Sequence, residues 1–253
     1  MYQKNQSYTV VIIAAGSGSR IVEKTNETPK TLLPFGDGTI LSCILTNFKN
    51  AGVEDFIIVA GYKANLIKEY VNKHNQFGLN ISFVMNPEWQ RGNGISVLAA
   101  EKAIKRNAFI LSMSDHIVSE SAINRLITSE DPANLLLVDR NVRDIFDIDD
   151  ATKVNLKENA ILEIGKGLTT YNGIDCGVFR LTNLFFDAMR RQLKIDKESI
   201  SSAIEILIEN KNMNAVFTRP EDFWLDIDTP EAYKFGLENL APIYRKSSVE
   251  IPK

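Results

Sequence analysis

The sequence holds few of the residues and segments that define several common classes of protein. It has two cysteines, Cys43 and Cys176, whose separation matches no metal-binding or redox motif, so we expect small core residues in a reducing cytoplasm. No apolar run is long enough to cross a bilayer, and the start of the chain lacks the apolar core of a signal peptide. The net charge of −3 offers no basic surface for nucleic acid. These absences predict a cytoplasmic protein that has no nucleic-acid partner and no membrane segment.

The composition is that of an ordinary globular protein, with 44% hydrophobic and 24% charged residues in a chain of 253. That length suffices for one large α/β domain with a substantial core. Through the first half, short apolar runs alternate with segments of helical spacing. The expected strands are 8–15, 56–61, 81–85 and 108–113, and the expected helices are 40–50, 64–73, 96–105 and 120–129. This alternation predicts a parallel sheet with helices on both faces.

The pattern changes after a strand expected at 135–139. Apolar runs on either side of the polar turn Lys157–Asn159 predict an antiparallel hairpin. Thr229 and Pro230 then predict the N-cap and first position of a last helix. The segments expected between them are strands at 175–181 and 215–218 and helices at 184–192 and 201–209. Because no linker or low-complexity segment separates these parts, we expect residues 1–253 to form a single domain.

A loop rich in glycine and serine follows the first strand. The buried-strand pattern of Val10–Ala15 ends abruptly at Gly16, and Gly18 follows two positions later. Glycine lets a backbone turn tightly and present its N–H groups to an anion. Arg20 adds a permanent positive charge to this loop, and Lys30 adds a mobile one further along the chain. This combination predicts a site for the phosphates of a nucleoside triphosphate.

Two commoner phosphate-binding loops do not match. A P-loop closes with Lys-Ser or Lys-Thr after its second glycine, whereas Ser19 and Arg20 follow Gly18 here. A dinucleotide-binding fingerprint needs a third glycine or an alanine at position 21, where the chain has Ile21. The second mismatch argues against a nicotinamide-linked dehydrogenase.

Aspartates stand at two places that suit a metal ion. Asp115 follows the predicted strand 108–113, and the carboxyl ends of parallel strands face the ligand crevice. Magnesium favours one or two carboxylates together with phosphate oxygens, so Asp115 is a candidate ligand. Asp226 and Asp228 lie two positions apart and share one face of any extended segment. Asp228 is also placed to cap the helix that begins beside it.

At this point the sequence resembles a known family. The segments 14–20 and 29–30, which read AAGSGSR and PK, resemble the signature loop of nucleotidyltransferases that join a nucleoside triphosphate to a phosphorylated sugar, polyol or alcohol. The resemblance extends from about Tyr8 to about Leu240. It implies an α/β, Rossmann-like nucleotidyltransferase fold: a mostly parallel mixed sheet flanked by helices, with a small antiparallel subregion on the acceptor side. It also divides the chain into a nucleotide-binding half, about 8–140, and an acceptor-binding half, about 141–240.

Finer motifs narrow the resemblance. Gly92, Asn93 and Ser96 precede or open a predicted helix and are small or polar enough to approach a base edge, although a helix N-terminus alone explains them. Their pattern resembles that of cytidylyltransferases rather than the glutamine-rich loop of thymidylyl- and uridylyltransferases. The segments 113–116, 151–154, 164–168, 171–179 and 224–233 resemble the cytidylyltransferases that activate inositol 1-phosphate. The implied reaction is a magnesium-dependent transfer of CMP from CTP to a small phosphorylated acceptor.

The resemblance also implies a role for each matching residue. Arg20 and Lys30 are the expected catalytic cations, and Asp115 and Asp226 hold the metal, with Asp228 in reserve. The nucleotide would be bound by Ala14, Ala15, Gly16, Ser17, Gly18, Ser19, Arg20, Lys30, Gly92, Asn93 and Ser96. The acceptor would be bound by Lys153, Lys166 and Asp175, the lysines on its phosphate and the aspartate on its hydroxyl groups. His116 is expected to be structural or to support the metal ligands, because an anionic phosphate needs no general base.

Several alternatives remain open at the level of the sequence. A phosphonate, phosphocholine or another phospho-alcohol could replace inositol phosphate as the acceptor. A hexose 1-phosphate nucleotidyltransferase that uses UTP or dTTP fits the loop at 92–96 less well. The chain could also be a non-catalytic nucleotide-binding module, which is a binding protein rather than an enzyme. The presence of Arg20, Lys30, Asp115 and Asp226 argues against this alternative.

Overall fold

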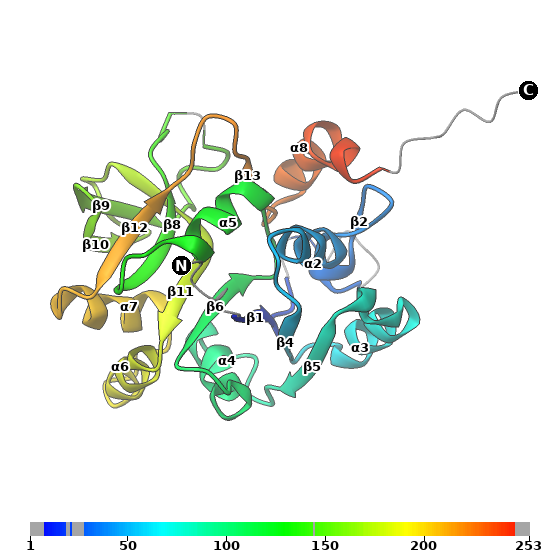
Figure 1. Ribbon diagram of the computed structural model, residues 1–253, viewed down its shortest axis with the longest axis horizontal. Helices are drawn as coiled ribbons and strands as arrows, with labels where there is room; N and C mark the ends of the chain where they lie inside the picture. Colours follow the sequence, from blue (N-terminus) through cyan, green and yellow to red (C-terminus); the bar gives the residue numbers. More distant parts are fainter. Residues whose placement is uncertain (1–7, 19–20, 22–27, 144, 246–253) are drawn as a thin grey trace, which may run out of the picture.

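The apolar run ahead of the glycine-rich loop forms strand β1 (Thr9–Ala14), which lies inside a parallel arrangement of strands. It pairs with β4 (Asp55–Ala60) on one side and β6 (Ala108–Met113) on the other, and β5 (Asn80–Met85) pairs beyond β4. In the computed structural model, which describes residues 8–18, 21, 28–143 and 145–245, these strands belong to a nine-stranded sheet (Figure 1). The parallel arrangement agrees with the alternation of strands and helices in the first half of the sequence.

The second half of the chain continues the same sheet with mixed strand directions. Its strands are β8 (Asn134–Asp139), β9 (Lys153–Lys157), β10 (Ala160–Gly165), β11 (Gly173–Thr182) and β12 (Met213–Phe217). Strand β11 runs antiparallel to both β6 and β8, whereas β12 runs parallel to β8. Strands β9 and β10 form the predicted antiparallel hairpin. The order across the sheet is β5-β4-β1-β6-β11-β8-β12-β10-β9, so β11 joins the two halves directly.

Helices cover both faces of the sheet because successive side chains of a strand point to opposite faces. In β1, Val10 and Ile12 belong to one hydrophobic core, and Val11 and Ile13 belong to a second. The first core contains side chains of α2 (Ile40–Asn50), α3 (Ala64–Lys73) and α5 (Glu120–Thr128). The second contains side chains of α4 (Asn93–Ala100), α6 (Leu184–Leu193) and α7 (Ile200–Glu209), which lie together below the sheet in Figure 1.

A short antiparallel ribbon lies apart from the main sheet. Strand β7 (His116–Val118) pairs with β13 (Trp224–Asp226), so that Asp226 stands opposite His116. Helix α8 (Pro230–Asn239) follows, and the Thr229 side chain accepts a hydrogen bond from the Ala232 N–H, as expected of its N-cap. The remaining elements are β2 (Pro34–Phe35), β3 (Gly38–Thr39), and the 3-10 helices η1 (Lys30–Leu32), η2 (Asn75–Gly78), η3 (Glu101–Ala103) and η4 (Ala241–Tyr244).

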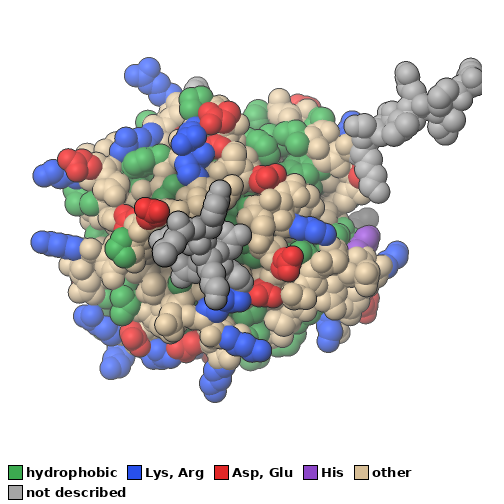
Figure 2. Space-filling view, viewed as in Figure 1, with side chains coloured by type: hydrophobic (Ala, Val, Ile, Leu, Met, Phe, Trp, Pro, Cys, Tyr) green, Lys and Arg blue, Asp and Glu red, His purple; other side chains and the backbone are tan. Residues whose placement is uncertain are grey.

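The fold confirms the predicted α/β class and mixed sheet. It differs from the prediction at the ends of some elements. The helix expected at 96–105 begins at Asn93 and ends at Ala100, where η3 takes over. Among the described helices, none has the length and apolarity needed to cross a membrane. On the face shown in Figure 2, acidic and basic side chains are interspersed and form no single basic patch. The single domain expected from the sequence stays a prediction.

Candidate active site

The carboxyl ends of β1 and β6 open onto a cavity of about 180 Å³. Its wall includes Gly16 and Gly18 from the glycine-rich loop, Lys30 from η1, and Asp115 from the turn after β6. Ala14, Ala15, Asn93 and Ser96 line it as well. Ser17 lies in the same loop and does not line the cavity, whereas Ser19 and Arg20 lie outside the described residues. The structure thus brings most of the residues predicted to bind nucleotide to one place.

A second cavity, of about 340 Å³, lies on the side of the acceptor-binding half. Lys166, Asp175 and Asp226 are among its lining residues. Asn93, Met113 and Asp115 line both cavities. The two cavities therefore meet beside the Asp115 carboxylate, which gives two bound molecules a common point of contact.

Lys30 is held at this junction by two carboxylates. Its ammonium group forms short ion pairs with Asp115 and Asp228. Gly18 packs against the stem of the same lysine: its φ is +62°, and a Cβ built there would lie 2.7 Å from the Lys30 Cβ. Glycine is needed at position 18 for both reasons, because other residues rarely adopt this φ and there is no room for a side chain. Asp228 therefore pairs with Lys30, while Thr229 rather than Asp228 caps α8.

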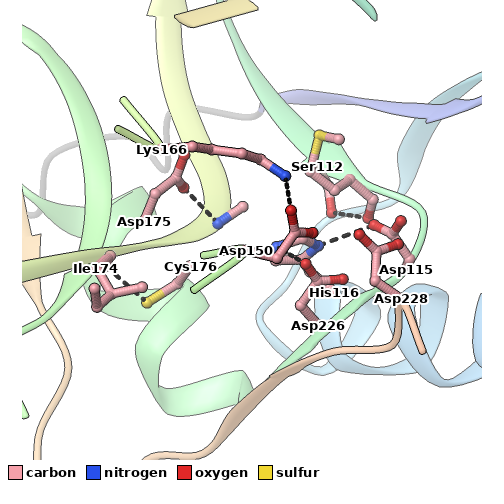
Figure 3. A network of polar contacts seen from close by, with 12 residues as sticks. Ser112, Asp115, His116, Asp150, Lys166, Ile174, Asp175, Cys176, Asp226 and Asp228 are labelled. Atoms are coloured by element: carbon pink, nitrogen blue, oxygen red, sulfur yellow. Dashed lines mark hydrogen bonds and ion pairs between the residues drawn. The ribbon is translucent and has the colours of Figure 1, made fainter. Parts of the chain in front are cut away.

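His116 lies between two aspartates at the start of β7. Its Nδ1 is 2.9 Å from Asp115 Oδ1, and its Nε2 is 3.7 Å from Asp226 Oδ2. Figure 3 shows the carboxylates of Asp115, Asp226 and Asp228 gathered around this ring. The pairing of β7 with β13 fixes Asp226 opposite His116, and the Ile227 N–H donates to the Asp115 carbonyl at 3.0 Å. Backbone bonds between distant parts of the chain thus fix the cluster.

The charges of this cluster support one another. Burial alone would lower the pKa of Lys30, but Asp115 and Asp228 outweigh it and raise that pKa above its ordinary value. Burial alone would raise the pKa of Asp115, but the Lys30 and His116 charges hold it well below its ordinary value. Burial also opposes the charged form of His116, and the Asp226 and Asp115 carboxylates nevertheless raise its pKa to about 9. Lys30 and His116 are therefore cations at neutral pH, and Asp115 is an anion.

Two further carboxyl groups have pKa values closer to neutral pH. Burial raises the pKa of Asp226 to about 7 against the opposing charge of His116. Burial likewise raises the pKa of Asp175 to about 6, although the Gly177 N–H and His116 act in the other direction. Burial therefore penalises the ionised form of both groups, and a bound cation would favour that form.

Asp115 and Asp226 fit a divalent metal ion, with His116 between them. Possible ligand atoms of the three side chains lie within 4.8 Å of one another, and the protonated His116 ring has no free lone pair, so the two carboxylates are the candidate ligands. Asp226 Oδ1 is buried and has no hydrogen-bond partner among the described residues. A buried carboxylate oxygen without a partner is costly, and a bound cation would satisfy it. A site with two carboxylates suits a hard cation such as Mg²⁺.

The residues predicted to bind the acceptor lie in different environments. Lys166 reaches across the mouth of the second cavity to Asp150, with Nζ 2.8 Å from Oδ1 (Figure 3). Asp175 lines the same cavity, and one of its oxygens accepts the Gly177 N–H at 2.7 Å. Lys153 is 7% exposed and does not line this cavity.

The Lys153 ammonium group donates to the carbonyl oxygens of Asp149, Ala151 and Lys166 at 3.1–3.3 Å. An ammonium group has three N–H donors, so these bonds occupy all of them. This geometry leaves no N–H of Lys153 for a phosphate, so it does not fit the direct contact that was expected from the sequence. Lys153 instead joins the backbone beside Lys166 to the loop that precedes β9.

Residues 92–96 are the N-cap and first turn of α4, and we call them the 92–96 loop. This loop joins the wall of the first cavity to the second half of the chain. Asn93 Oδ1 accepts the Ile200 N–H at 2.8 Å, and the Gly92 N–H donates to Glu198 Oε2 at 3.0 Å. The Ser96 hydroxyl accepts from Asn86 Nδ2 at 2.9 Å. Asn93 and Ser96 line the nucleotide-side cavity, whereas Gly92 acts through its backbone.

Sequence reasoning missed two residues that position His116. Gly177 has φ +76°, and a Cβ built there would lie 2.3 Å from Cδ2 of the His116 ring. Trp224 stacks near that ring, with centroids 6.4 Å apart, and its Nε1 donates to Asp139 Oδ2 at 2.8 Å. A glycine inside the expected strand 175–181 was a usable signal for close approach of another group. No local signal links Trp224 to His116.

The chain is similar in sequence to known proteins over most of its length. Residues 9–139 match the family model described as Nucleotidyl transferase. The Bifunctional IPC transferase and DIPP synthase of Thermococcus kodakarensis is 33% identical over 225 residues, which cover 88% of this chain and 48% of that protein. The protein of the same name from Aquifex aeolicus is 31% identical over 88% of this chain and 49% of its own length. The chain thus spans about half the length of these relatives.

Solved structures show the same fold. The inositol-1-phosphate CTP transferase from T. maritima superposes with a TM-score of 0.82 at 24% sequence identity. The match covers 91% of this chain and 93% of that one.

Proposed function

The chain belongs to the nucleotidyl transferase family, and we propose that it transfers CMP from CTP to a small phosphorylated alcohol, with inositol 1-phosphate as the acceptor. The observation that carries the proposal is the meeting of two cavities at Asp115, with Lys30 and His116 beside it. One cavity has the glycine-rich wall suited to a triphosphate, and the other has the lysine and aspartates suited to a phosphorylated polyol. The names of the IPC transferase relatives and of the inositol-1-phosphate CTP transferase support this pair of substrates.

The proposed reaction joins two anions. An oxygen of the acceptor phosphate attacks the α-phosphorus of CTP in line; the new P–O bond forms as the bond to the β-phosphate oxygen breaks, and pyrophosphate leaves. The attacking oxygen is already anionic, so the protein needs to neutralise charge and orient the two molecules rather than remove a proton. Lys30 lines the nucleotide-side cavity and pairs with Asp115, which lines both cavities, so its charge lies beside the point where the two phosphates would meet. His116 orients Asp115 and Asp226 instead of acting as a base.

A divalent cation would be held by Asp115 and Asp226, and we propose Mg²⁺. When bound, it would supply positive charge to an α-phosphate oxygen and to the departing pyrophosphate. Its binding would use the buried Asp226 Oδ1, which has no other partner among the described residues.

On the nucleotide side, the backbone at Ala14, Ala15 and 16–18 would hold the phosphates and the nucleoside through N–H groups and close approach. Ser19 and Arg20 lie outside the described residues and keep the roles predicted from the sequence, with Arg20 on the β- and γ-phosphates. Gly92 and Ser96 shape the loop that carries Asn93.

Asn93 supports cytosine as the base. A backbone N–H can only donate, so the Ile200 N–H fixes which end of the Asn93 amide carries the oxygen. Because that oxygen is occupied, the amide nitrogen is the part that remains for a ligand in the cavity. Cytosine offers acceptors at both N3 and O2, whereas uracil has an N–H donor at position 3. An amide donor therefore favours CTP over UTP at that position.

On the acceptor side, Lys166 would bind the acceptor phosphate and Asp175 would accept hydrogen bonds from hydroxyl groups. Lys153 would keep the Lys166 backbone in place through the carbonyl oxygens that it binds. We assign it this supporting role in place of a direct phosphate contact.

The test is pyrophosphate release in the presence of Mg²⁺, with each common nucleoside triphosphate and a panel of acceptors. The panel holds inositol 1-phosphate, phosphocholine, 2-aminoethylphosphonate and glucose 1-phosphate. Release with CTP and inositol 1-phosphate alone is the expected result. Lys30→Met should abolish release, and Lys234→Met, at an exposed lysine on α8, should leave it unchanged.

Other outcomes would revise the proposal in defined ways. CTP-specific release with another acceptor would keep the reaction and replace the substrate. If no pair of nucleoside triphosphate and acceptor released pyrophosphate, and CTP still bound without Mg²⁺, a non-catalytic nucleotide-binding module would be favoured.

A further inference from the structure

The start of α7 binds the loop that leads into α4. Glu198 accepts the Gly92 N–H on its carboxylate at 3.0 Å and the Gly94 N–H on its backbone carbonyl at 2.9 Å. The Ile200 N–H completes the contact by donating to Asn93 Oδ1. Three successive residues of the loop are therefore bound by residues 198–200, which belong to the other half of the chain.

The fit between these segments leaves little freedom. A Cβ on Gly92 would lie 2.5 Å from the Glu198 Cβ, and one on Gly94 would lie 2.5 Å from Met189 Sδ in α6. Only glycine permits backbones to approach this closely. The loop is therefore docked against α6 and the start of α7.

The Glu198 carboxylate serves the loop and not its own helix. Helix α7 is capped by Ser199, whose side chain accepts the Ser202 N–H at 3.1 Å. Helix α4 has Gly92 as its N-cap, which has no side chain to accept an N–H. Glu198 supplies an acceptor and a negative charge at that N-terminus, where both are favourable. The Arg91 guanidinium, which also lines the nucleotide-side cavity, donates to Glu198 Oε1 from Nε at 3.0 Å.

This contact lies between the two cavities. Arg91, Asn93 and Ser96 line the nucleotide-side cavity, and Ile200 and Ser201 line the acceptor-side cavity. The Ile200 N–H is the donor that orients the Asn93 amide. Residues 198–201 thus reach the loop at one end and the acceptor cavity at the other.

We infer that Glu198 is a positioning residue for base selection, because it holds the loop so that the Asn93 amide nitrogen meets an acceptor on the base. The inference rests on the proposed function in one respect, namely that the preferred nucleotide is CTP. Glu198 itself lines neither cavity. Its removal should therefore loosen the choice between CTP and UTP and leave the chemical step intact.

The experiment measures the dissociation constants of CTP and UTP by calorimetry and then kcat and KM with each nucleotide. It compares the wild-type protein with Glu198→Ala, Glu198→Gln and Glu205→Gln. Glu205 is a matched control because it lies on α7 in an exposed ion pair with Lys197. Glu198→Ala should lower the CTP-over-UTP preference about tenfold, through the CTP dissociation constant and KM, with kcat within about twofold, as expected for roughly one net hydrogen bond.

The conservative variant separates positioning from stability. Glu198→Gln keeps an oxygen that accepts the Gly92 N–H, so it should recover most of the preference, and Glu205→Gln should match the wild type. An unchanged preference in a folded Glu198→Ala protein, or an equal loss of kcat with both nucleotides, would overturn the inference. A wild-type protein that prefers UTP or shows no preference would overturn the proposed base as well, which distinguishes the two failures.

Discussion

Replacement of Gly177 by alanine should displace His116 and disable the site. A Cβ at this position would lie 2.3 to 2.9 Å from three atoms of the His116 ring. Neither the His116 ring nor the Gly177 backbone can move away easily. The ring lies between Asp115 and Asp226, and Gly177 lies inside β11. The φ of +76° adds strain of its own for any residue with a side chain.

The two costs can be given magnitudes. Left-handed backbone costs a non-glycine residue about 1–2 kcal/mol, and overpacking costs about 1–3 kcal/mol, so we expect a loss of about 2–5 kcal/mol in the free energy of unfolding. A ring displaced by about 1 Å would misplace both carboxylates that we propose as metal ligands and lower the rate about a hundredfold.

Urea unfolding and pyrophosphate release measure these effects. Gly52→Ala is the control, since Gly52 also has a positive φ, of +85°, but a Cβ there meets nothing within 4 Å. It isolates the backbone strain from the clash with His116. The reasoning would be refuted if Gly177→Ala unfolded at the same urea concentration as Gly52→Ala and kept the wild-type rate of release.

Three further predictions concern the metal, the histidine and the lysines. We expect Mg²⁺ to raise the melting temperature of the wild type and Asp226→Asn to abolish that rise; a Mg²⁺-dependent rise that persists in the variant would contradict the proposed ligand. Without divalent ions, the raised pKa of His116 contributes stability that is complete below about pH 6.5 and is lost towards pH 9. His116→Gln should therefore cost on the order of 3 kcal/mol more at pH 6 than at pH 9.5 in urea unfolding, and an equal cost at both would refute this. Lys166→Met should raise the KM of the acceptor about tenfold with the KM of CTP unchanged, whereas Lys153→Met should lower the unfolding free energy by about 1–3 kcal/mol, and reversed effects would refute both roles.

Much of the fold could be predicted from the sequence because its signals are local. The run Val10–Ala15 is continuous, β-branched and apolar, which indicates a strand buried on both faces, and β1 lies inside the sheet. Asp115 follows such a strand, so its place at the carboxyl edge of the sheet was predictable. The ribbon of β7 and β13 was not, because strands of three residues are too short to show a period.

Side-chain roles depended on contacts that no local pattern carries. Lys153 and Lys166 looked alike in the sequence, each a lysine within a motif of the acceptor half. In the structure one is buried among carbonyl oxygens and the other is exposed at the mouth of a cavity. Asp228 could cap a helix or bind a metal on sequence grounds, and the structure pairs it with Lys30.

By itself, the sequence determined the order of the elements, the glycine-rich character of the first loop and the positions of the acidic residues. These follow from hydrophobic spacing and from the chemistry of single residues, both of which are local in the sequence. Only the tertiary structure decided that Asp226 meets His116, that Gly177 makes room for that ring and that Glu198 binds the loop ahead of α4. Each of these depends on backbone segments 61 to 110 residues apart, whose approach is set by the packing of the whole sheet and its helices.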